Sequence, residues 1–294
     1  MHGFLRKMSS AIPTNGCSID QPIEYFLRLD TDVHRISDWL GSTLSLSFTG
    51  RIECIECGRV TKKSFSQGYC FRCFKQLAQC DLCMVSPERC HFEKGTCRDA
   101  SFAKDICMQP HIVYLANSSG LKVGITRPGN LPTRWIDQGA VQALPIMTVM
   151  SRQQSGFVEV ALKQHVSDKT QWQKMLKGEA KCINLEEARD NLMRTAKTDL
   201  DPVLHRFGVQ AIQPIVDAKV QTLVYPVNEY PEKIVSLNLD KTPQVVGKLN
   251  GIKGQYLILE KGVINLRRFT GYEIELSVID PDDENDKTEQ LILL

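Results

Sequence analysis

The sequence predicts an α+β fold made of several modules, and three observations favour this class. Nine of the eleven cysteines lie between Cys54 and Cys107, which is typical of a segment held together by metal ions. Short β-branched runs then alternate with amphipathic helical patterns as far as about residue 200. From Ala211 onward, β-branched runs separated by glycine and proline predict an all-β region, either a small barrel or a sandwich.

These observations divide the chain into five predicted parts. The first two are an N-terminal α+β segment at residues 1–50 and a zinc-ribbon-like cysteine module at residues 51–108. They are followed by a small α/β hairpin domain at residues 109–200, an all-β C-terminal domain at residues 201–280 and an acidic tail at residues 281–294.

The N-terminal part contains two predicted strands, at Tyr25–Leu29 and Leu44–Phe48, with a short helix near Asp32–Leu40 between them. These strands are candidates to complete the C-terminal β domain, which supplies about five short strands of its own. Between the two regions, Asn184 and Glu187 have the spacing of a capping box. This pattern predicts a helix over residues 184–198.

Composition and charge limit the classes of protein to which this chain can belong. The net charge of the 294 residues is +2, so any surface for a polyanion must be a local patch. No apolar run approaches the roughly 18–20 residues that span a bilayer, which argues against a membrane protein. The N-terminal stretch MHGFLRKMSSAIPTNG also lacks the apolar middle of a secretory signal. We therefore expect a cytoplasmic protein, in which clustered cysteines bind metal rather than form disulfides.

Two Cys-x-x-Cys pairs open the cysteine module and predict a structural zinc site. Each pair supplies two thiolates from one tight turn, and Zn²⁺ takes four such ligands at tetrahedral corners. Gly58 follows the first pair directly, as a tight turn with positive φ requires. Residues 59–68 between the pairs are expected to form a short hairpin, and the alternative for the group is four buried free cysteines. The predicted ligands are Cys54, Cys57, Cys70 and Cys73.

A second group of cysteines follows, and the sequence leaves its ligand choice open. Four cysteines would close a second structural zinc site, although His91 or Cys107 could replace the last two of them. An iron–sulfur cluster is the alternative, but its cysteines usually come in tighter runs with a distinctive proline. The predicted ligands are Cys80, Cys83, Cys90 and Cys97.

Basic and aromatic residues are interleaved around the first two pairs. Residues 51–75 carry six basic side chains against two acidic ones, and Phe65 and Tyr69 lie among them. Such a mixture can grip a phosphate backbone and stack on bases. The alternative is a solvated face whose aromatic side chains cover a thin core. The predicted nucleic-acid contacts in this module are Lys62, Lys63 and Arg72.

The middle region has the pattern of a hairpin followed by helices and a third strand. The hairpin strands are β-branched and are joined by the turn sequence Asn-Ser-Ser-Gly. Pro132 is placed to open a short helix, and Gly139 to end it. The predicted elements are strands at His111–Ala116, Leu121–Thr126 and Ala143–Met150, and helices at residues 132–139 and 153–166.

Two short motifs of this hairpin resemble those of a nuclease superfamily. The run IVY at residues 112–114 and the run KVG at residues 122–124 resemble the paired strands of the GIY-YIG nucleases, especially the smaller branches whose second motif begins with lysine. A helix with Arg134 and a later helix with Glu159 follow in the same order. The resemblance covers about residues 111–180. As a whole, the chain looks like a bacterial cysteine-rich family of unknown function.

The resemblance implies a chemistry and a set of site residues. In the superfamily a hairpin tyrosine helps to activate water, an arginine holds the scissile phosphate, and a glutamate binds one divalent metal ion. These roles would fall, in that order, to Tyr114, Arg134 and Glu159, with Mg²⁺ as the metal. Lys122 stands where the second tyrosine normally lies, and a cation there would lower the pKa of the Tyr114 phenol. Further predicted phosphate contacts are Arg127 and Arg152.

The sequence thus favours a zinc-containing, nucleic-acid-binding protein with a Mg²⁺-dependent, GIY-YIG-like endonuclease site. The alternative is a non-catalytic scaffold that binds nucleic acid or another protein, and a redox or metal sensor ranks below both. Departures from the superfamily motifs keep the alternative open, such as Ile112 at the position of the first glycine. A late asparagine of the superfamily also has no clear counterpart, and the candidates are Asp168 and Thr170.

Overall fold

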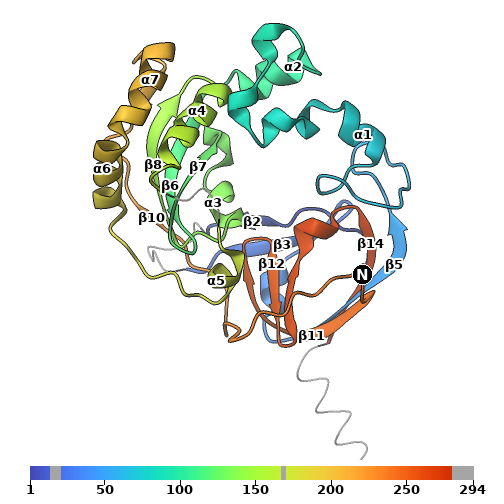
Figure 1. Cartoon of the computed structure of the whole chain (residues 1–294). Helices are drawn as coiled ribbons and strands as arrows, with labels where there is room; N and C mark the ends of the chain where they lie inside the picture. Colours follow the sequence, from blue (N-terminus) through green and yellow to red (C-terminus); the bar gives the residue numbers. More distant parts are fainter. Residues whose placement is uncertain (14–20, 167–169, 280–294) are drawn as a thin grey trace, which may run out of the picture. The chain divides into compact units, whose positions relative to one another are not determined.

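The computed structural model describes residues 1–13, 21–166 and 170–279, and its helices and antiparallel sheets confirm the predicted α+β class (Figure 1). The predicted acidic tail, residues 281–294, lies outside the described residues. None of the described helices is long and apolar enough to cross a membrane. The chain divides into two compact units: unit 1 is Met1–Cys73, Leu176–Gly178 and Val224–Leu294, and unit 2 is Phe74–Met175 and Glu179–Leu223.

Unit 1 is built on an antiparallel sheet whose strands come from the two ends of the chain (Figure 1). β5 (Thr43–Ile52) lies between β14 (Tyr272–Ile279) and β11 (Gln244–Lys253). Leu46 of β5 pairs with Leu276 of β14, and both side chains are buried, so alternate residues of β5 face the core. The other described strands of this sheet are β1 (His2–Phe4) beside β14, and β12 (Tyr256–Leu259) and β13 (Gly262–Asn265) beyond β11.

A smaller sheet of unit 1 stands where the sequence predicts a helix near residues 32–40. β3 (Glu24–Leu29) pairs with β2 (Ser9–Ala11) and β4 (Asp32–His34), and only a 3-10 turn forms at Ile36–Trp39. The helix prediction is wrong because Asp30 takes a left-handed φ of 50° in a two-residue hairpin turn between β3 and β4. Within the described chain, β3 therefore belongs to this sheet and not to that of β5 and β14.

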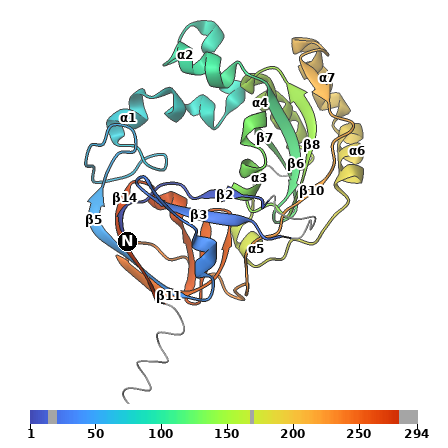
Figure 2. The same ribbon diagram turned by 180° about the vertical axis from the view of Figure 1, so that it is seen from behind.

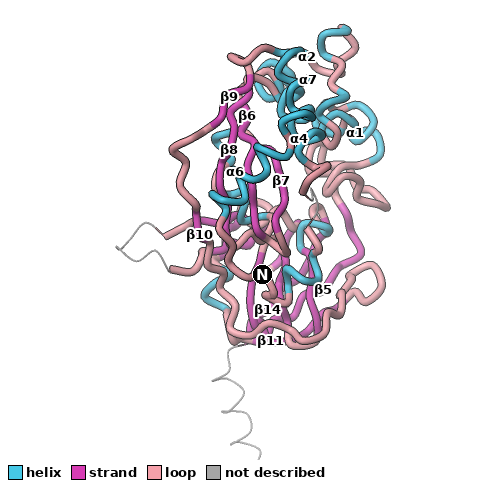
Figure 3. Tube along the Cα trace, turned by 60° about the vertical axis from the view of Figure 1, so that its left-hand side comes forward, coloured by secondary structure: helices cyan, strands magenta, loops and turns pink. Residues whose placement is uncertain are grey.

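Unit 2 has its own antiparallel sheet, which contains the predicted hairpin with β6 as an interior strand and β7 at the edge (Figure 3). β6 (His111–Asn117) pairs on one side with β7 (Leu121–Thr126) and on the other with β8 (Gln142–Val149). The bounds of these three strands differ from the predicted ones by at most one residue. Two short strands also pair with β8, namely β9 (Ile212–Pro214) and β10 (Gln221–Thr222).

Helices α4, α6 and α7 pack against one face of this sheet (Figure 2). Val113 and Leu144 on that face share a buried cluster with Val158 of α4, Leu192 of α6 and Leu200 of α7. The side chain of Asn184 caps α6 by accepting a hydrogen bond from a backbone N–H at 3.0 Å, as the sequence predicts. The described helices of unit 2 include α3 (Thr133–Asp137), α4 (Arg152–Leu162), α6 (Leu185–Thr195) and α7 (Lys197–Phe207).

The prediction of an all-β region from residue 201 does not anticipate α7. Pro202 lies inside this helix, where a proline removes one backbone donor and crowds the preceding turn. Leu200 and Val203 beside it are buried in the apolar cluster of unit 2, and this burial outweighs the unfavourable proline. β9 and β10, which follow α7, belong to the sheet of unit 2.

The cysteine-rich stretch folds into a succession of short turns. After α1 (Phe71–Gln76) come 3-10 turns at Ala78–Cys80, Leu82–Met84, Pro87–Arg89 and Phe92–Lys94, then α2 (Ala100–Phe102) and a π-helical turn at Ala103–Cys107. Such short elements bury little apolar surface, so they depend on other interactions for their stability. Other short elements of the described chain are α5 (Trp172–Leu176) and 3-10 turns at Pro128–Asn130 and Leu266–Phe269, besides those already named.

A buried lysine in unit 1 gives a prediction about stability and pH. Lys253 is fully buried, and its Nζ lies 5.2 Å and 5.1 Å from the ring centres of Tyr225 and Tyr230. Burial lowers the pKa of Lys253 from 10.5 to about 8. Because the folded state favours the neutral amine, stability is lowest below pH 8, where both states carry the proton, and rises between pH 8 and pH 10.5.

We therefore expect Lys253→Met to raise the free energy of unfolding at pH 7 by about 2 kcal/mol. This gain is the cost of the buried charge less the lost cation–π contacts. The gain should shrink as the pH approaches 9.5, where wild-type Lys253 is mostly neutral in the folded state. Urea titrations at pH 7 and pH 9.5 measure the free energy of unfolding. The control is Lys248→Met, at an exposed position of the same strand. A less stable Lys253→Met protein would show instead that the two tyrosine rings outweigh the cost of burial.

Candidate functional site

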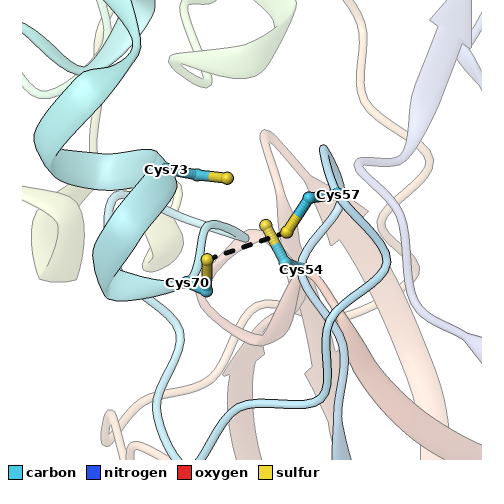
Figure 4. A group of neighbouring side chains, drawn as sticks. All are labelled: Cys54, Cys57, Cys70 and Cys73. Carbon is cyan, nitrogen blue, oxygen red and sulfur yellow. Dashed lines mark hydrogen bonds between the residues drawn. The ribbon is translucent and has the colours of Figure 1, made fainter.

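The first cysteine cluster lies in unit 1, between the end of β5 and the start of α1 (Figure 4). Cys54 and Cys57 follow β5, whereas Cys70 and Cys73 come from the first turn of α1 and the residue before it. The four Sγ atoms all lie within 4.8 Å of one another, and those of Cys57 and Cys70 are 3.8 Å apart. The structure thus brings both Cys-x-x-Cys pairs to one point.

Local backbone geometry explains how the first pair forms its turn. Gly58 has a φ of 67°, and its N–H donates to the Cys54 carbonyl oxygen at 2.9 Å. The chain between the two pairs does not form the continuous hairpin predicted for residues 59–68. Only isolated bridges occur there among the described residues, such as that of Phe65 with Tyr69, because α1 takes over directly after Cys70.

The thiols of this cluster differ in how readily they ionise. Burial alone raises the pKa of the Cys54 thiol, but backbone N–H donors, those of Cys57 and Cys70 among them, lower it to about 6. Burial and the neighbouring thiols raise the pKa of Cys73. Four thiols at this spacing cannot all ionise without a cation, and Zn²⁺ takes four thiolates. The cluster is therefore compatible with a structural zinc site.

The second group of cysteines lies in unit 2 and surrounds a small cavity. The cavity has a volume of about 10 Å³, and the cysteines that line it are Cys83, Cys90, Cys97 and Cys107. Of the four predicted ligands, Cys80 is therefore the one that does not line the cavity. Asp81 and His91 line it too, and ligand atoms of Asp81, Cys83 and His91 lie within 4.8 Å of one another. A zinc site with Cys80 as a ligand stays a prediction.

The predicted nucleic-acid contacts outside the cavities are mostly exposed. Lys62, Lys63 and Arg72 are exposed in unit 1, and Lys63 Nζ lies 5.5 Å from the centre of the Phe65 ring. Arg127, in unit 2, is half-buried. Cations beside an aromatic ring can contact both phosphate and base, but a solvated face has the same appearance. Their role in binding stays a prediction.

A larger cavity in unit 2 is lined by two of the four predicted catalytic residues, Arg134 and Glu159. Its volume is about 270 Å³, and the lining includes Gly124 of β7, Arg134 and Gln138 at α3, and Arg152 and Glu159 of α4. Arg134 is exposed, whereas Arg152 and Glu159 are half-buried. Two guanidinium groups and one carboxylate in an open cavity can bind a phosphate ester together with a divalent cation.

The Tyr114 side chain is fully buried and bonds to a residue that lines this cavity. Its hydroxyl donates to Gln138 Oε1 at 2.9 Å. A Cβ atom on Gly124 would lie 2.6 Å from the hydroxyl, so glycine is required there to leave room for the phenol. Burial raises the pKa of Tyr114 to about 12, although the nearby Arg134 opposes the shift. The expectation of a lowered pKa is therefore wrong, because desolvation outweighs the neighbouring charge.

Lys122, the remaining predicted catalytic residue, is buried and does not line this cavity. Its Nζ donates to Thr170 Oγ1 at 2.7 Å. Thr170 is one of the two candidates for the late asparagine, and the other, Asp168, lies outside the described residues. Gln138 is a cavity residue that the sequence reasoning missed. Its position four residues after Arg134, one helical turn on, is the signal that could have found it.

The N-terminal turn of α4 is fastened to the second cysteine region. The Ser151 side chain caps the helix by accepting a backbone hydrogen bond at 3.3 Å. Arg152 donates from Nη2 to the Met84 carbonyl oxygen at 2.6 Å, and Gln153 donates to the Cys90 carbonyl oxygen at 3.0 Å. The helix that carries Glu159 is therefore held in place by the cysteine-bearing turns.

Comparison with known proteins identifies the family of the chain. No curated protein matches it, and no solved structure matches it. A family model described as "Protein of unknown function (DUF2797)" matches residues 41–274, a range that includes the first cysteine cluster and the cavity around Arg134 and Glu159. The match covers well over half of the sequence, and the chain therefore belongs to this family of unknown function.

Proposed function

We propose that this protein binds nucleic acid and cleaves phosphodiester bonds at the cavity around Arg134 and Glu159. The observation that carries the proposal is that these two side chains line one cavity together with Arg152 and Gln138. The order along the chain supports it, since hairpin, arginine helix and glutamate helix follow one another as in the GIY-YIG nucleases. In this proposal the hairpin sheet is the core of a GIY-YIG-like domain, and the first cysteine cluster is a zinc-ribbon-like module.

Phosphate binding is assigned to the two arginines. The exposed Arg134 offers a guanidinium fork that can bond two phosphoryl oxygens at once. Arg152 uses Nη2 for the Met84 carbonyl oxygen, but its Nε is buried and bonds to no described atom. An acceptor oxygen of a substrate would satisfy this donor. Both positive charges would then oppose the negative charge that grows on the phosphoryl oxygens.

The oxygen atoms that fit a divalent cation are those of Glu159 and Gln138. Mg²⁺ prefers oxygen ligands and commonly binds through one or two carboxylates together with substrate phosphates. When bound, Mg²⁺ would add positive charge beside the phosphoryl group and lower the pKa of a coordinated water. Gln138 Oε1 already accepts the Tyr114 hydrogen bond, and its second lone pair is available for such a contact.

Tyr114 is assigned a positioning role in this site. With a pKa of about 12, its phenol stays protonated at neutral pH and donates a hydrogen bond to Gln138 Oε1, so it does not take a proton from water. The hydrogen bond fixes the orientation of the Gln138 amide, because the phenol itself is held between Gly124 and Trp135.

A cleavage assay with labelled duplex, branched and single-stranded DNA and RNA, with and without Mg²⁺, tests the proposal. We expect Mg²⁺-dependent cleavage of at least one substrate. Glu159→Gln, which keeps the shape of the side chain and removes its charge, should lower the rate about a hundredfold or more. Glu186→Gln, at an exposed position of α6 in the same unit, is the matched control and should keep full activity.

Binding without cleavage would contradict an endonuclease and favour the non-catalytic scaffold. One observation favours this second function, since Lys122 replaces a catalytic tyrosine and is held by Thr170. The affinity of a scaffold that contacts phosphates should fall steeply with salt. The triple variant Lys62→Ala, Lys63→Ala, Arg72→Ala should reduce that dependence, whereas Glu159→Gln should leave it unchanged.

A further inference from the structure

Four cysteines of unit 2 come from successive turns and face one small cavity. Cys83 lies within the 3-10 turn Leu82–Met84, and Cys90 directly follows the turn Pro87–Arg89. Cys97 comes after the turn Phe92–Lys94, and Cys107 ends the π-helical turn. The cavity volume of about 10 Å³ is near the least that admits one water-sized sphere, so there is room for a single ion and none for an organic ligand.

The neighbourhood of these thiols favours a cation in that cavity. Four thiols from four separate turns line one space, and that space has room for a single ion. Zn²⁺ takes four thiolates, and its charge offsets the repulsion among them. The turns that carry them are three to five residues long, so burial of apolar surface alone gives them little stability.

Two alternative ligands, Asp81 and His91, line the same cavity but already have partners. Asp81 Oδ2 forms an ion pair with Arg98 Nε at 2.7 Å, and Asp81 Oδ1 accepts a hydrogen bond from the Cys83 N–H at 3.2 Å. His91 Nδ1 lies 2.8 Å from the Thr96 hydroxyl oxygen. His91 Nε2 in turn lies 3.5 Å from Asp81 Oδ1, so these two side chains already interact with each other.

We propose that Cys83, Cys90, Cys97 and Cys107 form a second, closed zinc site, in which Cys107 replaces the Cys80 of the sequence motif. This site differs from the first cluster in unit and ligands, and it does not depend on the proposed nuclease activity. Its role is to hold the cysteine-bearing turns rigid against α4. Two hydrogen bonds connect these turns to the helix of Glu159. They run from Arg152 to the Met84 carbonyl oxygen and from Gln153 to the Cys90 carbonyl oxygen, so rigid turns hold that helix in place.

Zinc content of single variants, measured by plasma mass spectrometry on the full chain, tests the ligand set. Wild type should hold two zinc ions, Cys83→Ser and Cys107→Ser one each, and the double variant Cys70→Ser, Cys107→Ser none. Cys80→Ser and Cys182→Ser should keep both ions. Cys97→Ser, which removes another of the four proposed ligands, should also hold one ion.

Two results would overturn the proposal. If Cys80→Ser lost one ion and Cys107→Ser kept two, Cys80 and not Cys107 would be a ligand, as the spacing of the cysteines predicts. Loss of one ion in Asp81→Asn, again with two retained in Cys107→Ser, would assign the site to Asp81, Cys83 and His91.

A measurement on the unmodified protein covers the case in which a variant fails to fold. Zinc-edge X-ray absorption should show only sulfur ligands at about 2.3 Å if both sites are formed by four cysteines. A mixture of sulfur with nitrogen or oxygen ligands near 2.0 Å would contradict the closed thiolate site.

Discussion

Cys70→Ser is expected to remove one zinc ion per chain and to unfold the segment from residue 53 to residue 73. Cys70 is only 4% exposed, so serine leaves a buried hydroxyl among three crowded thiols. Structural zinc contributes roughly 10–16 kcal/mol in zinc-finger peptides, which is as large as the whole stability of many domains. Zinc content and hydrogen–deuterium exchange of residues 53–73 measure the two effects. The strands of the neighbouring sheet should keep most of their protection, because their cores do not contain the metal ligands.

Cys182→Ser is the matched control for this experiment, since Cys182 is exposed and lies in unit 2. All samples need a reducing agent, so that disulfide formation cannot imitate the effect of metal. If Cys70→Ser kept its zinc and its protection from exchange, the four thiols would be an ordinary apolar core, and the zinc interpretation of the first cluster would fail.

Gly156→Val is expected to lower the stability of unit 2 by about 3 kcal/mol or more. A Cβ atom at residue 156 would lie 2.5 Å from the backbone nitrogen of Glu88 and 2.7 Å from the Pro87 Cβ. A backbone atom cannot swing aside as a flexible side chain can, so α4 and the turn Pro87–Arg89 would have to separate. Urea unfolding followed by the fluorescence of the buried Trp135 measures the loss.

Gly129→Val controls for the general effect of replacing glycine in the same unit. A Cβ atom at residue 129 meets nothing within 4 Å, so this variant should change the free energy of unfolding by no more than about 0.5 kcal/mol. If Gly156→Val were as stable as Gly129→Val, α4 would not be tightly packed on the cysteine-bearing turns. Those turns would then not hold the helix of Glu159 in place.

The sequence predicted well those features that a few neighbouring residues determine. Spacing alone identified the first four clustered cysteines, and Gly58 marked the turn with positive φ between them. Turn residues and β-branched runs identified the hairpin of β6 and β7, whose strands pair from residue 112 with residue 126 to residue 117 with residue 121. In each case the deciding interaction is local in the chain, so composition and spacing carry the information.

The features that sequence reasoning missed depend on partners far along the chain. Pro202 argues against a helix locally, but burial of its neighbours in the core of unit 2 stabilises one. Cys80 belongs to a Cys-x-x-Cys pair, yet the cavity is lined by Cys107, because spacing does not determine which way a thiol points from a short turn. The high pKa of Tyr114 likewise follows from burial by residues of α3, which the hairpin sequence alone does not contain.

The placement of β5 between β11 and β14 has a consequence for how the protein is made. Leu46 cannot meet Leu276 until about two hundred further residues have left the ribosome, which takes roughly ten seconds or more at about 5–20 residues per second. During that interval the thiols from Cys54 to Cys73 have been synthesised, while the strand that completes their neighbouring sheet has not. Early capture of zinc would protect these thiols from oxidation, so the supply of zinc during translation should influence how much of the chain reaches its folded state.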